Sequence, residues 1–127
     1  MTAAAKRGPV LYVDDQGSSV KLFQLHFAEE FDLEGFTSPT RAIARAKERN
    51  FALLVADYRM VEMDGLELAR HFQVHHPRTI RVLYTALDHL DVVDQALKSG
   101  LIAQVITKPV SLDDVAVRLK ALLETAS

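Results

Sequence analysis

Short apolar segments alternate with segments of helical periodicity along the chain, and this alternation constrains the fold more than any other feature. The five apolar segments, interpreted as strands, are 10–13, 33–36, 51–56, 80–84 and 103–106. The five segments interpreted as helices are 18–30, 39–48, 65–75, 90–98 and one that begins at Ser111. Such alternation is typical of parallel βαβ units with helices on both faces of one sheet. The sequence therefore predicts an α/β fold with a doubly wound, five-stranded parallel sheet in the order 2-1-3-4-5.

The size and composition of the chain indicate a single domain. It has 127 residues, of which 49% are hydrophobic, enough to bury one core. We expect a polar tail at residues 1–8 and one domain over residues 9–124. There is no cysteine, and no apolar run approaches the roughly 20 residues that span a bilayer, so we expect a cytoplasmic location. The net charge of −2 gives no indication of nucleic-acid binding.

Polar residues stand where four of the predicted strands end. Asp14 and Asp15 follow the first strand and Asp57 follows the third, while Thr85 and Lys108 come at the ends of the fourth and fifth. Ligands of open α/β sheets bind outside the carboxyl ends of the strands, so we expect these side chains to converge in one crevice. Any one of them alone would be ordinary turn chemistry. A matching set at four separate strand ends favours a functional site.

The chemistry of this set suits the transfer of a phosphoryl group to a carboxylate. Three carboxylates that lie close together repel each other, and a divalent cation removes that cost. A site made only of oxygen atoms suits Mg²⁺ better than zinc, so we expect Asp14, Asp15 and Asp57 to hold Mg²⁺. Lys108 supplies a positive charge for Asp57 or for a phosphoryl oxygen, and Thr85 supplies a hydroxyl donor. Positioning and charge neutralisation are what phosphoryl transfer requires.

The chain resembles the CheY-like receiver domain of bacterial two-component response regulators over essentially its whole length. The segments that carry the resemblance are Leu-Tyr-Val-Asp-Asp at 11–15, the stretch 54–65 around Asp57, Thr-Ala at 85–86 and Thr-Lys-Pro at 107–109. Together, in this order and spacing, these segments are highly specific, although none of them is specific alone. The resemblance implies a flavodoxin-like (βα)5 fold and a role in a phosphorelay.

The resemblance also implies a role for each matching acidic residue. Asp57 would be the phosphoacceptor, taking its phosphoryl group from a sensor histidine kinase or a phosphotransfer protein. Asp15, Asp57 and the backbone carbonyl of Arg59 would bind Mg²⁺ directly, while Asp14 would act mainly through water.

The switch that the resemblance implies is incomplete in this sequence. Lys108 would bind the phosphoryl group, and Thr85 would swing toward a phosphoryl oxygen and draw its loop along. The family usually has an aromatic residue three positions before the lysine, and here that altered position is Val105. Valine has no ring to flip, so we expect the phosphorylated state to be reported differently. Tyr84 is expected to point away from the side of Thr85 and is not a substitute.

Two positions flank the expected path of an attacking water molecule, Arg59 and Leu87. By resemblance, residues there tune the lifetime of the phosphorylated state. We hypothesise that both exclude water and slow hydrolysis. Val61 replaces a proline common in the family, a change that should leave the chemistry unaffected.

The resemblance places an output surface on the fourth helix, fifth strand and fifth helix. Its expected residues include Asp91, Gln95, Lys98, Val105 and Lys120. The expected partner there is a downstream output domain or protein, or a second copy of the chain in a homodimer. We expect neither a membrane contact nor direct nucleic-acid binding, because the basic residues within 41–49 are interpreted as a solvated helix face. The histidines within 71–76 are likewise interpreted as ordinary surface rather than a zinc site.

Three functions compete at this point. The first is a phosphoacceptor switch that is not a metabolic enzyme. The second is a phosphatase or phosphotransferase with an aspartyl-phosphate intermediate, which would usually need an acid/base aspartate two residues after the nucleophile, where this chain has Arg59. The third is a degenerate receiver that acts as a protein-interaction scaffold. The intact acidic set argues against the scaffold, and Val105 argues for it.

Overall fold

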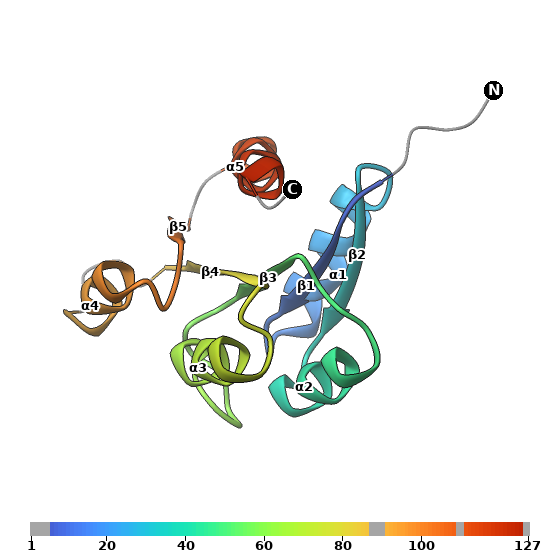
Figure 1. Cartoon of the computed structure of the whole chain (residues 1–127). Coiled ribbons are helices and arrows are strands. Elements are labelled where there is room, and N and C mark those ends of the chain that lie inside the picture. The colour runs from blue at the N-terminus through green and yellow to red at the C-terminus, as the bar shows by residue number, and fades with distance from the viewer. Residues whose placement is uncertain (1–5, 87–90, 109–110, 126–127) are drawn as a thin grey trace.

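The computed structural model describes residues 6–86, 91–108 and 111–125, which form one parallel sheet with helices on both faces (Figure 1). The strands are β1 (Arg7–Val13), β2 (Phe31–Phe36), β3 (Leu53–Ala56), β4 (Ile80–Thr85) and β5 (Gln104–Thr107). The helices are α1 (Gly17–Phe27), α2 (Pro39–Glu48), α3 (Gly65–His75), α4 (Asp91–Ser99) and α5 (Leu112–Thr125). The predicted sequence of elements is confirmed, as is the fold class.

The strand order is β2-β1-β3-β4-β5, with every neighbouring pair parallel. The change of direction in this order falls between β1 and β3, where Val13 pairs with Ala56. A crevice opens at such a point because the connections that leave the two strands run to opposite faces of the sheet. The predicted order is therefore confirmed, and it brings the residues that follow β1 and β3 side by side.

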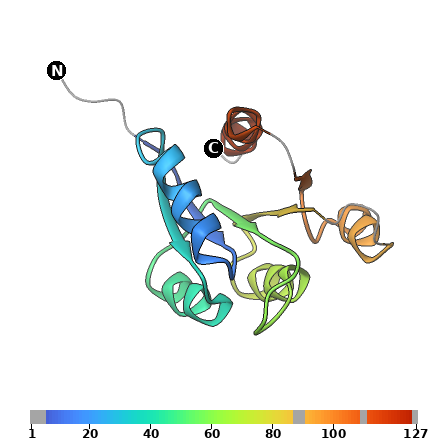
Figure 2. The ribbon, with the colours of Figure 1, turned by 180° about the vertical axis from the view of Figure 1, so that it is seen from behind.

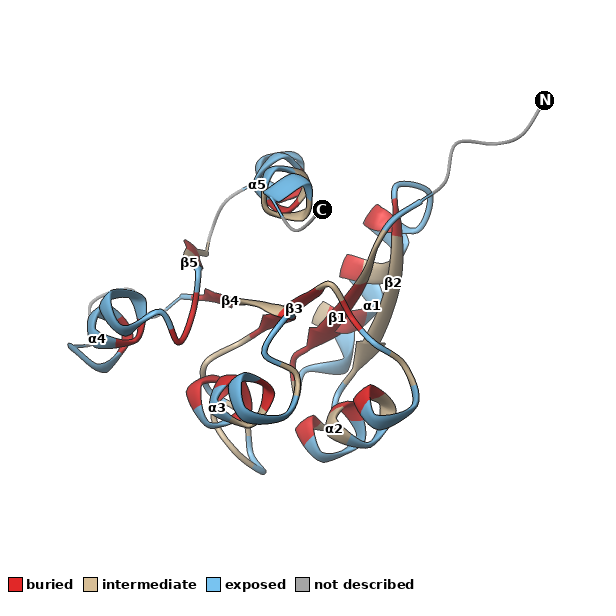
Figure 3. Ribbon diagram, in the orientation of Figure 1, coloured by how far each residue is buried: buried red, intermediate tan, exposed pale blue. Residues whose placement is uncertain are grey.

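Alternate residues of each strand supply two separate core layers. Tyr12 and Val55 face α1 and α5, whereas Leu11 and Leu54 face α2 and α3. A third apolar cluster lies under α4 and includes Leu101 together with Ile102. Figure 3 shows buried residues along the strands and on the inner sides of the helices, and Figure 2 shows α1 alongside β1 and β2. Burial on both faces explains why the strands are continuously apolar in the sequence.

Helix starts follow from capping residues that the sequence makes visible. Ser38 accepts a hydrogen bond from the amide of Arg41 and precedes proline at the first position of α2. Asp64 and Glu67 form a reciprocal capping box at the start of α3. At α5, the amide of Asp114 donates to Ser111 Oγ at 3.1 Å. Each cap satisfies an amide that would otherwise lack a partner in the first helical turn.

The first strand and first helix differ from their predicted bounds. β1 begins at Arg7, inside the segment 1–8 that was expected to be a tail, because the Arg7 amide donates to the Glu30 carbonyl and its guanidinium pairs with Glu124. α1 ends at Phe27 rather than at Glu30, where the amide of Glu30 turns back to the Phe27 carbonyl. Both differences come from contacts with distant or following residues that hydrophobic periodicity does not encode.

The basic residues of α2 are partly neutralised within the domain. Arg45 donates two hydrogen bonds to the Glu34 carboxylate, at 2.7 and 3.0 Å, and Arg49 donates another at 2.6 Å. Arg49 also pairs with Asp32 on the same strand. These ion pairs tie α2 to β2 and lower the pKa of Glu34, chiefly through the hydrogen bond from Arg45. Within the described part of the chain, no helix has the length and apolar character needed to cross a membrane.

Candidate functional site

The predicted site residues meet at the carboxyl edge of the sheet. Asp14 and Asp15 follow β1, Asp57 follows β3, Thr85 ends β4 and Lys108 follows β5. A hollow of about 490 Å³ opens at this edge. Its lining consists of Gln16, Asp57, Arg59, Thr85, Ala86 and Lys108. The sheet topology therefore brings these strand ends together, as the sequence predicts.

Lys108 is the cation that the site residues share. Its Nζ lies 3.4 Å from Asp14 Oδ2 and 3.5 Å from Asp57 Oδ2, as donor to both carboxylates. Its backbone amide donates to the Thr85 carbonyl at 2.8 Å, which fixes the end of β5 against the end of β4. One ammonium thus faces two carboxylates, and Asp15 adds a third negative charge nearby in sequence. The acidic groups outnumber the ammonium, so this edge favours an additional cation.

Asp57 is held at the mouth of the hollow by its own loop. Its Oδ1 accepts a 2.7 Å hydrogen bond from the Tyr58 amide, and its side chain remains 19% exposed. The Asp57 amide donates to the Val13 carbonyl at 3.0 Å, which ties the residue to β1. The loop closes at Gly65, where a Cβ atom would lie 2.3 Å from the Asp57 carbonyl oxygen. Only glycine fits there without moving the backbone of Asp57.

Asp15 connects the first strand with the loop that follows Asp57. Its Oδ2 accepts a 3.2 Å hydrogen bond from the amide of Val61. One residue further along, the Glu62 carboxylate accepts hydrogen bonds from Ser38 Oγ and the Thr40 amide, at 2.8 and 3.1 Å. The loop after β3 is therefore tied both to β1 and to the start of α2. This double attachment fixes the backbone around Arg59.

Asp14 has a different environment from its neighbour. It is completely buried, its Oδ2 accepts a 2.9 Å hydrogen bond from the Tyr12 hydroxyl, and its Oδ1 accepts a 3.0 Å bond from the Gln16 amide. Burial raises the pKa of Tyr12, and the negative charge of Asp14 raises it further, so the hydroxyl stays protonated as a donor. Sequence reasoning missed Tyr12, although residues two apart on a strand share a face.

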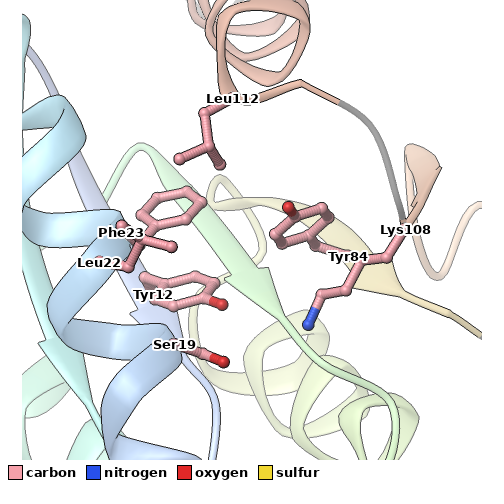
Figure 4. A pocket seen from close by; sticks show the side chains of 7 residues that line it. All are labelled: Tyr12, Ser19, Leu22, Phe23, Tyr84, Lys108 and Leu112. Atoms are coloured by element: carbon pink, nitrogen blue, oxygen red, sulfur yellow. The ribbon is translucent and has the colours of Figure 1, made fainter.

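A small aromatic recess lies beside Lys108 on the α1 and α5 side of the sheet (Figure 4). Its volume is about 140 Å³, and its lining consists of Tyr12, Ser19, Leu22, Phe23, Tyr84, Lys108 and Leu112. Lys108 Nζ lies 4.8 Å from the centroid of the Tyr84 ring, within the range of a cation–π contact. In Figure 4 the Tyr84 hydroxyl points away from the Lys108 ammonium. Tyr84 therefore packs in the apolar cluster on the α1 and α5 side of the sheet.

The predicted switch positions differ in their surroundings. Thr85 is 1% exposed, and its carbonyl is the acceptor for Lys108 described above. Val105 pairs in register with Leu83 and packs against the apolar cluster under α4. It is half-buried on the α4 side of β5 and adds no polar group to the crevice. Leu87, the second of the two predicted tuning positions, lies outside the described residues, whereas exposed Arg59 lines the hollow.

The predicted output residues do not all lie on one surface. Asp91, Gln95 and Lys98 are exposed on α4. Lys120, expected on the same surface of α4, β5 and α5, pairs instead with Glu30, which follows α1, so its side chain reaches toward α1. The α5 face that carries Lys120 turns toward α1 because Val115 and Leu119 are buried against that side of the sheet. Helical periodicity alone could not distinguish the two flanks of α5.

The donor atoms at the acidic edge fit Mg²⁺. They are carboxylate and carbonyl oxygens, the hard ligands that this ion takes, usually through one or two carboxylates and several waters. In residues 6–86, 91–108 and 111–125 there is no group of three or more His, Cys, Asp or Glu side chains arranged to hold a metal. Asp14 accepts the Tyr12 hydroxyl and is buried, whereas Asp15 and Asp57 are partly exposed at this edge. The histidines within 71–76 likewise form no such group.

Comparison with known proteins identifies the family. Residues 10–120 match the family described as "Response regulator receiver domain". Response regulator protein PilR of Pseudomonas aeruginosa is 32% identical over 124 residues, covering 94% of this chain and 26% of PilR. The chain therefore spans about a quarter of the length of that relative.

Solved structures show the same fold. A CheY-like response regulator receiver domain protein from Methanospirillum hungatei superposes with a TM-score of 0.87 at 21% identity, covering 96% of this chain and 97% of that chain. Response regulator protein TrrA from Thermotoga maritima, in complex with Mg²⁺ and a beryllium fluoride, gives a TM-score of 0.79 at 24% identity, covering 93% and 99%. With the sequence match over residues 10–120, these likenesses show that the chain belongs to the response regulator receiver domain family.

Proposed function

We propose that this chain is a Mg²⁺-dependent phosphoacceptor switch in which Asp57 receives the phosphoryl group. The observation that carries the proposal is the position of the Asp57 carboxylate, partly exposed at the mouth of the hollow and 3.5 Å from Lys108 Nζ. An exposed nucleophilic oxygen beside a cation is what attack on an anionic phosphoryl group requires. Asp14 is fully buried and therefore cannot present an oxygen to a donor in this way.

The donor in this proposal is a phosphohistidine on a sensor histidine kinase or phosphotransfer protein. A carboxylate oxygen of Asp57 attacks phosphorus, the new O–P bond forms, and the P–N bond to the donor imidazole breaks. The electron pair of that bond leaves with the imidazole, which takes up a proton. A carboxylate attacks without giving up a proton, so the step requires no general base from the chain. Lys108 and Thr85 are placed to donate hydrogen bonds to the transferred phosphoryl oxygens.

Mg²⁺ belongs to the proposal on the basis of charge and donor chemistry. Asp15, Asp57 and the backbone carbonyl of Arg59 would hold the ion, which would neutralise charge on the phosphoryl oxygens during transfer. That TrrA, which has the same fold, was solved in complex with Mg²⁺ and a beryllium fluoride supports a role for this ion here. The hydrogen bonds that Val61 donates to Asp15 and that Ser38, at the start of α2, donates to Glu62 pre-position the loop that carries Arg59.

The partner that reads the switch would be an output domain or a separate protein. PilR extends well beyond the region matched by this chain, which supports a further domain in proteins of this type. We propose that the exposed surface of α4 with β5, including Gln95 and Lys98, carries the readout, and that it can also support a homodimer. The hydrogen bond from the Lys108 backbone amide to the Thr85 carbonyl connects the site with β5. This connection does not depend on an aromatic side chain at position 105, where the chain has valine.

One experiment tests the proposal against its alternatives. The protein and its Asp57→Asn variant are incubated with Mg²⁺ and acetyl phosphate, and the intact masses are measured. We expect the mass of one phosphoryl group on the wild type and none on the variant. Absence of both phosphorylation and Mg²⁺ binding would indicate a scaffold. Steady turnover of a phosphate ester such as p-nitrophenyl phosphate would indicate an enzyme, and either result would overturn the proposal.

A further inference from the structure

Asp14 is the acidic residue whose surroundings depart most from a simple metal ligand. Its carboxylate is completely buried, and both of its oxygens accept hydrogen bonds from the protein. Oδ2 takes the Tyr12 hydroxyl at 2.9 Å as well as the Lys108 ammonium at 3.4 Å. Asp15 and Asp57 are partly exposed and face the loop and the hollow. Adjacent carboxylates in the sequence therefore have opposite orientations.

Tyr12 can direct Asp14 because its ring is fixed. The ring stacks on that of Phe23 with centroids 3.9 Å apart and planes inclined by only 5°. Tyr84 packs against both rings, at centroid distances of 6.5 and 6.1 Å. A side chain held on two sides has little freedom to withdraw its hydroxyl, and Figure 4 shows this hydroxyl on the side of the recess where Lys108 lies.

We propose that Tyr12 is a positioning residue, which holds Asp14 inward as the counter-charge of Lys108 and keeps it out of the ligand set of Mg²⁺. This inference rests on the proposed function and concerns the same site. The Tyr12 hydroxyl donates to Asp14 Oδ2, which also accepts from Lys108. It therefore fixes the position of the Lys108 ammonium in the unphosphorylated protein. The metal is then left to Asp15 and Asp57.

Removal of the hydroxyl should strengthen Mg²⁺ binding. In Tyr12→Phe the ring keeps its stack on Phe23, but Asp14 loses one donor and part of its charge compensation. A buried carboxylate that has lost a hydrogen-bond donor gains more from an added cation. Here Mg²⁺ can supply that gain, through direct contact or through a metal-bound water. We expect the dissociation constant for Mg²⁺ to fall about threefold to tenfold, a part of what a hydrogen bond to a charged group contributes.

The control is another variant that removes a buried hydroxyl far from the site. Thr79 Oγ1 donates to the Phe51 carbonyl at 2.7 Å, at the opposite edge of the sheet. Thr79→Val should therefore lose stability without a change in Mg²⁺ affinity. The second comparison uses Asp14→Asn with and without Tyr12→Phe. If Tyr12 acts through the Asp14 carboxylate, Tyr12→Phe has no effect on Mg²⁺ affinity once that carboxylate is gone.

Mg²⁺ titrations followed by two-dimensional NMR measure these affinities and also report whether each variant is folded. The amides of Gln16 and Tyr58, which donate to Asp14 and Asp57, serve as local probes. Unchanged or weaker binding in Tyr12→Phe overturns the inference, and so does an equal gain in the Asp14→Asn background or in Thr79→Val. If the wild type binds Mg²⁺ and takes phosphate at Asp57 but Tyr12→Phe changes nothing, only this inference falls. If the wild type binds no Mg²⁺, the proposed function falls with it.

Discussion

Lys108 and Asp57 meet across the crevice of the sheet, with the ammonium nitrogen 3.5 Å from Asp57 Oδ2. The same ammonium lies 3.4 Å from Asp14 and over the ring of Tyr84. These contacts hold the positive charge at the place where a phosphoryl group on Asp57 would need a donor. In the proposed function, the pair would join the nucleophile to the group that stabilises its product.

Lys108→Ala should slow phosphorylation of Asp57 by about 100-fold or more, the size typical for loss of one preorganised donor. The variant also leaves the buried Asp14 carboxylate without its ammonium partner. The rate is measured from the growth of the phosphorylated mass with acetyl phosphate. Lys47→Ala removes an exposed ammonium from α2 and serves as the matched control, with an unchanged rate expected. Equal rates in the two variants would contradict the role given to Lys108.

Gly65→Ala should disturb the site and the fold together. Its new Cβ would meet the Asp57 carbonyl oxygen at 2.3 Å and the Leu83 side chain at 2.8 Å, so the loop after β3 must shift. We expect a loss of about 1–3 kcal/mol in the free energy of unfolding, together with weaker Mg²⁺ binding.

Gly100→Ala is the control for glycine replacement. Gly100 has a φ of +80°, but no atom lies within 4 Å of the place that an alanine methyl group would take, so only backbone strain of about 1 kcal/mol is expected there. Urea unfolding and Mg²⁺ titration of both variants distinguish the cases. Retention of normal Mg²⁺ affinity in Gly65→Ala would show that the loop tolerates the methyl group.

Stability should fall on mild acidification because of two histidines near the end of α3. Burial lowers the pKa of His71, with further contributions from His75, His76 and Lys47, and burial also lowers the pKa of His76. The unfolded chain, with ordinary histidine pKa values of about 6.5, then binds protons that the folded chain does not. The stability from these groups is present above about pH 6.5 and is lost as the pH falls toward their folded values.

Urea unfolding at pH 7.5 and at pH 5.5 measures this loss. His71→Gln removes the group with the larger number of charged neighbours and should reduce the dependence of stability on pH over this range. Carboxylates such as Glu34 titrate at lower pH and do not contribute to the same window. An unchanged pH dependence in the variant would contradict the assignment to His71.

Arg59→Asn should shorten the lifetime of the phosphorylated state. Arg59 is exposed and lines the hollow beside Asp57, where a large side chain limits the approach of water. The shorter asparagine side chain should let water reach the phosphoryl group on Asp57, so hydrolysis should be faster. Loss of the phosphorylated mass is followed after removal of acetyl phosphate. Decay at the wild-type rate or slower would contradict the hypothesis.

The sequence predicted those features that depend on local pattern. α3 has the predicted bounds because Asp64 starts it with a capping box and Pro77 follows its end. The convergence of Asp57, Thr85 and Lys108 followed from strand ends and parallel topology. Tertiary contacts set the remaining features. The inward turn of Asp14 depends on a rigid stack between Tyr12 and α1, and no spacing rule specifies the direction of a carboxylate after a strand end.

The reach of Lys120 toward Glu30 has the same kind of cause. The angle at which α5 packs on the sheet decides which flank of the helix faces α1, and that angle depends on the shapes of the core side chains. The start of β1 at Arg7 depends on Glu30 and Glu124, which are distant in the sequence. Such contacts appear only when the elements are assembled.

The most direct test of the central claim is to locate the phosphoryl group among the three neighbouring aspartates. After incubation with acetyl phosphate and Mg²⁺, borohydride reduces an aspartyl phosphate to homoserine, and tandem mass spectrometry of peptides finds the altered position. The account predicts homoserine at position 57 and unchanged aspartate at positions 14 and 15. Homoserine at Asp14 or Asp15, or no homoserine at any of the three, would contradict it.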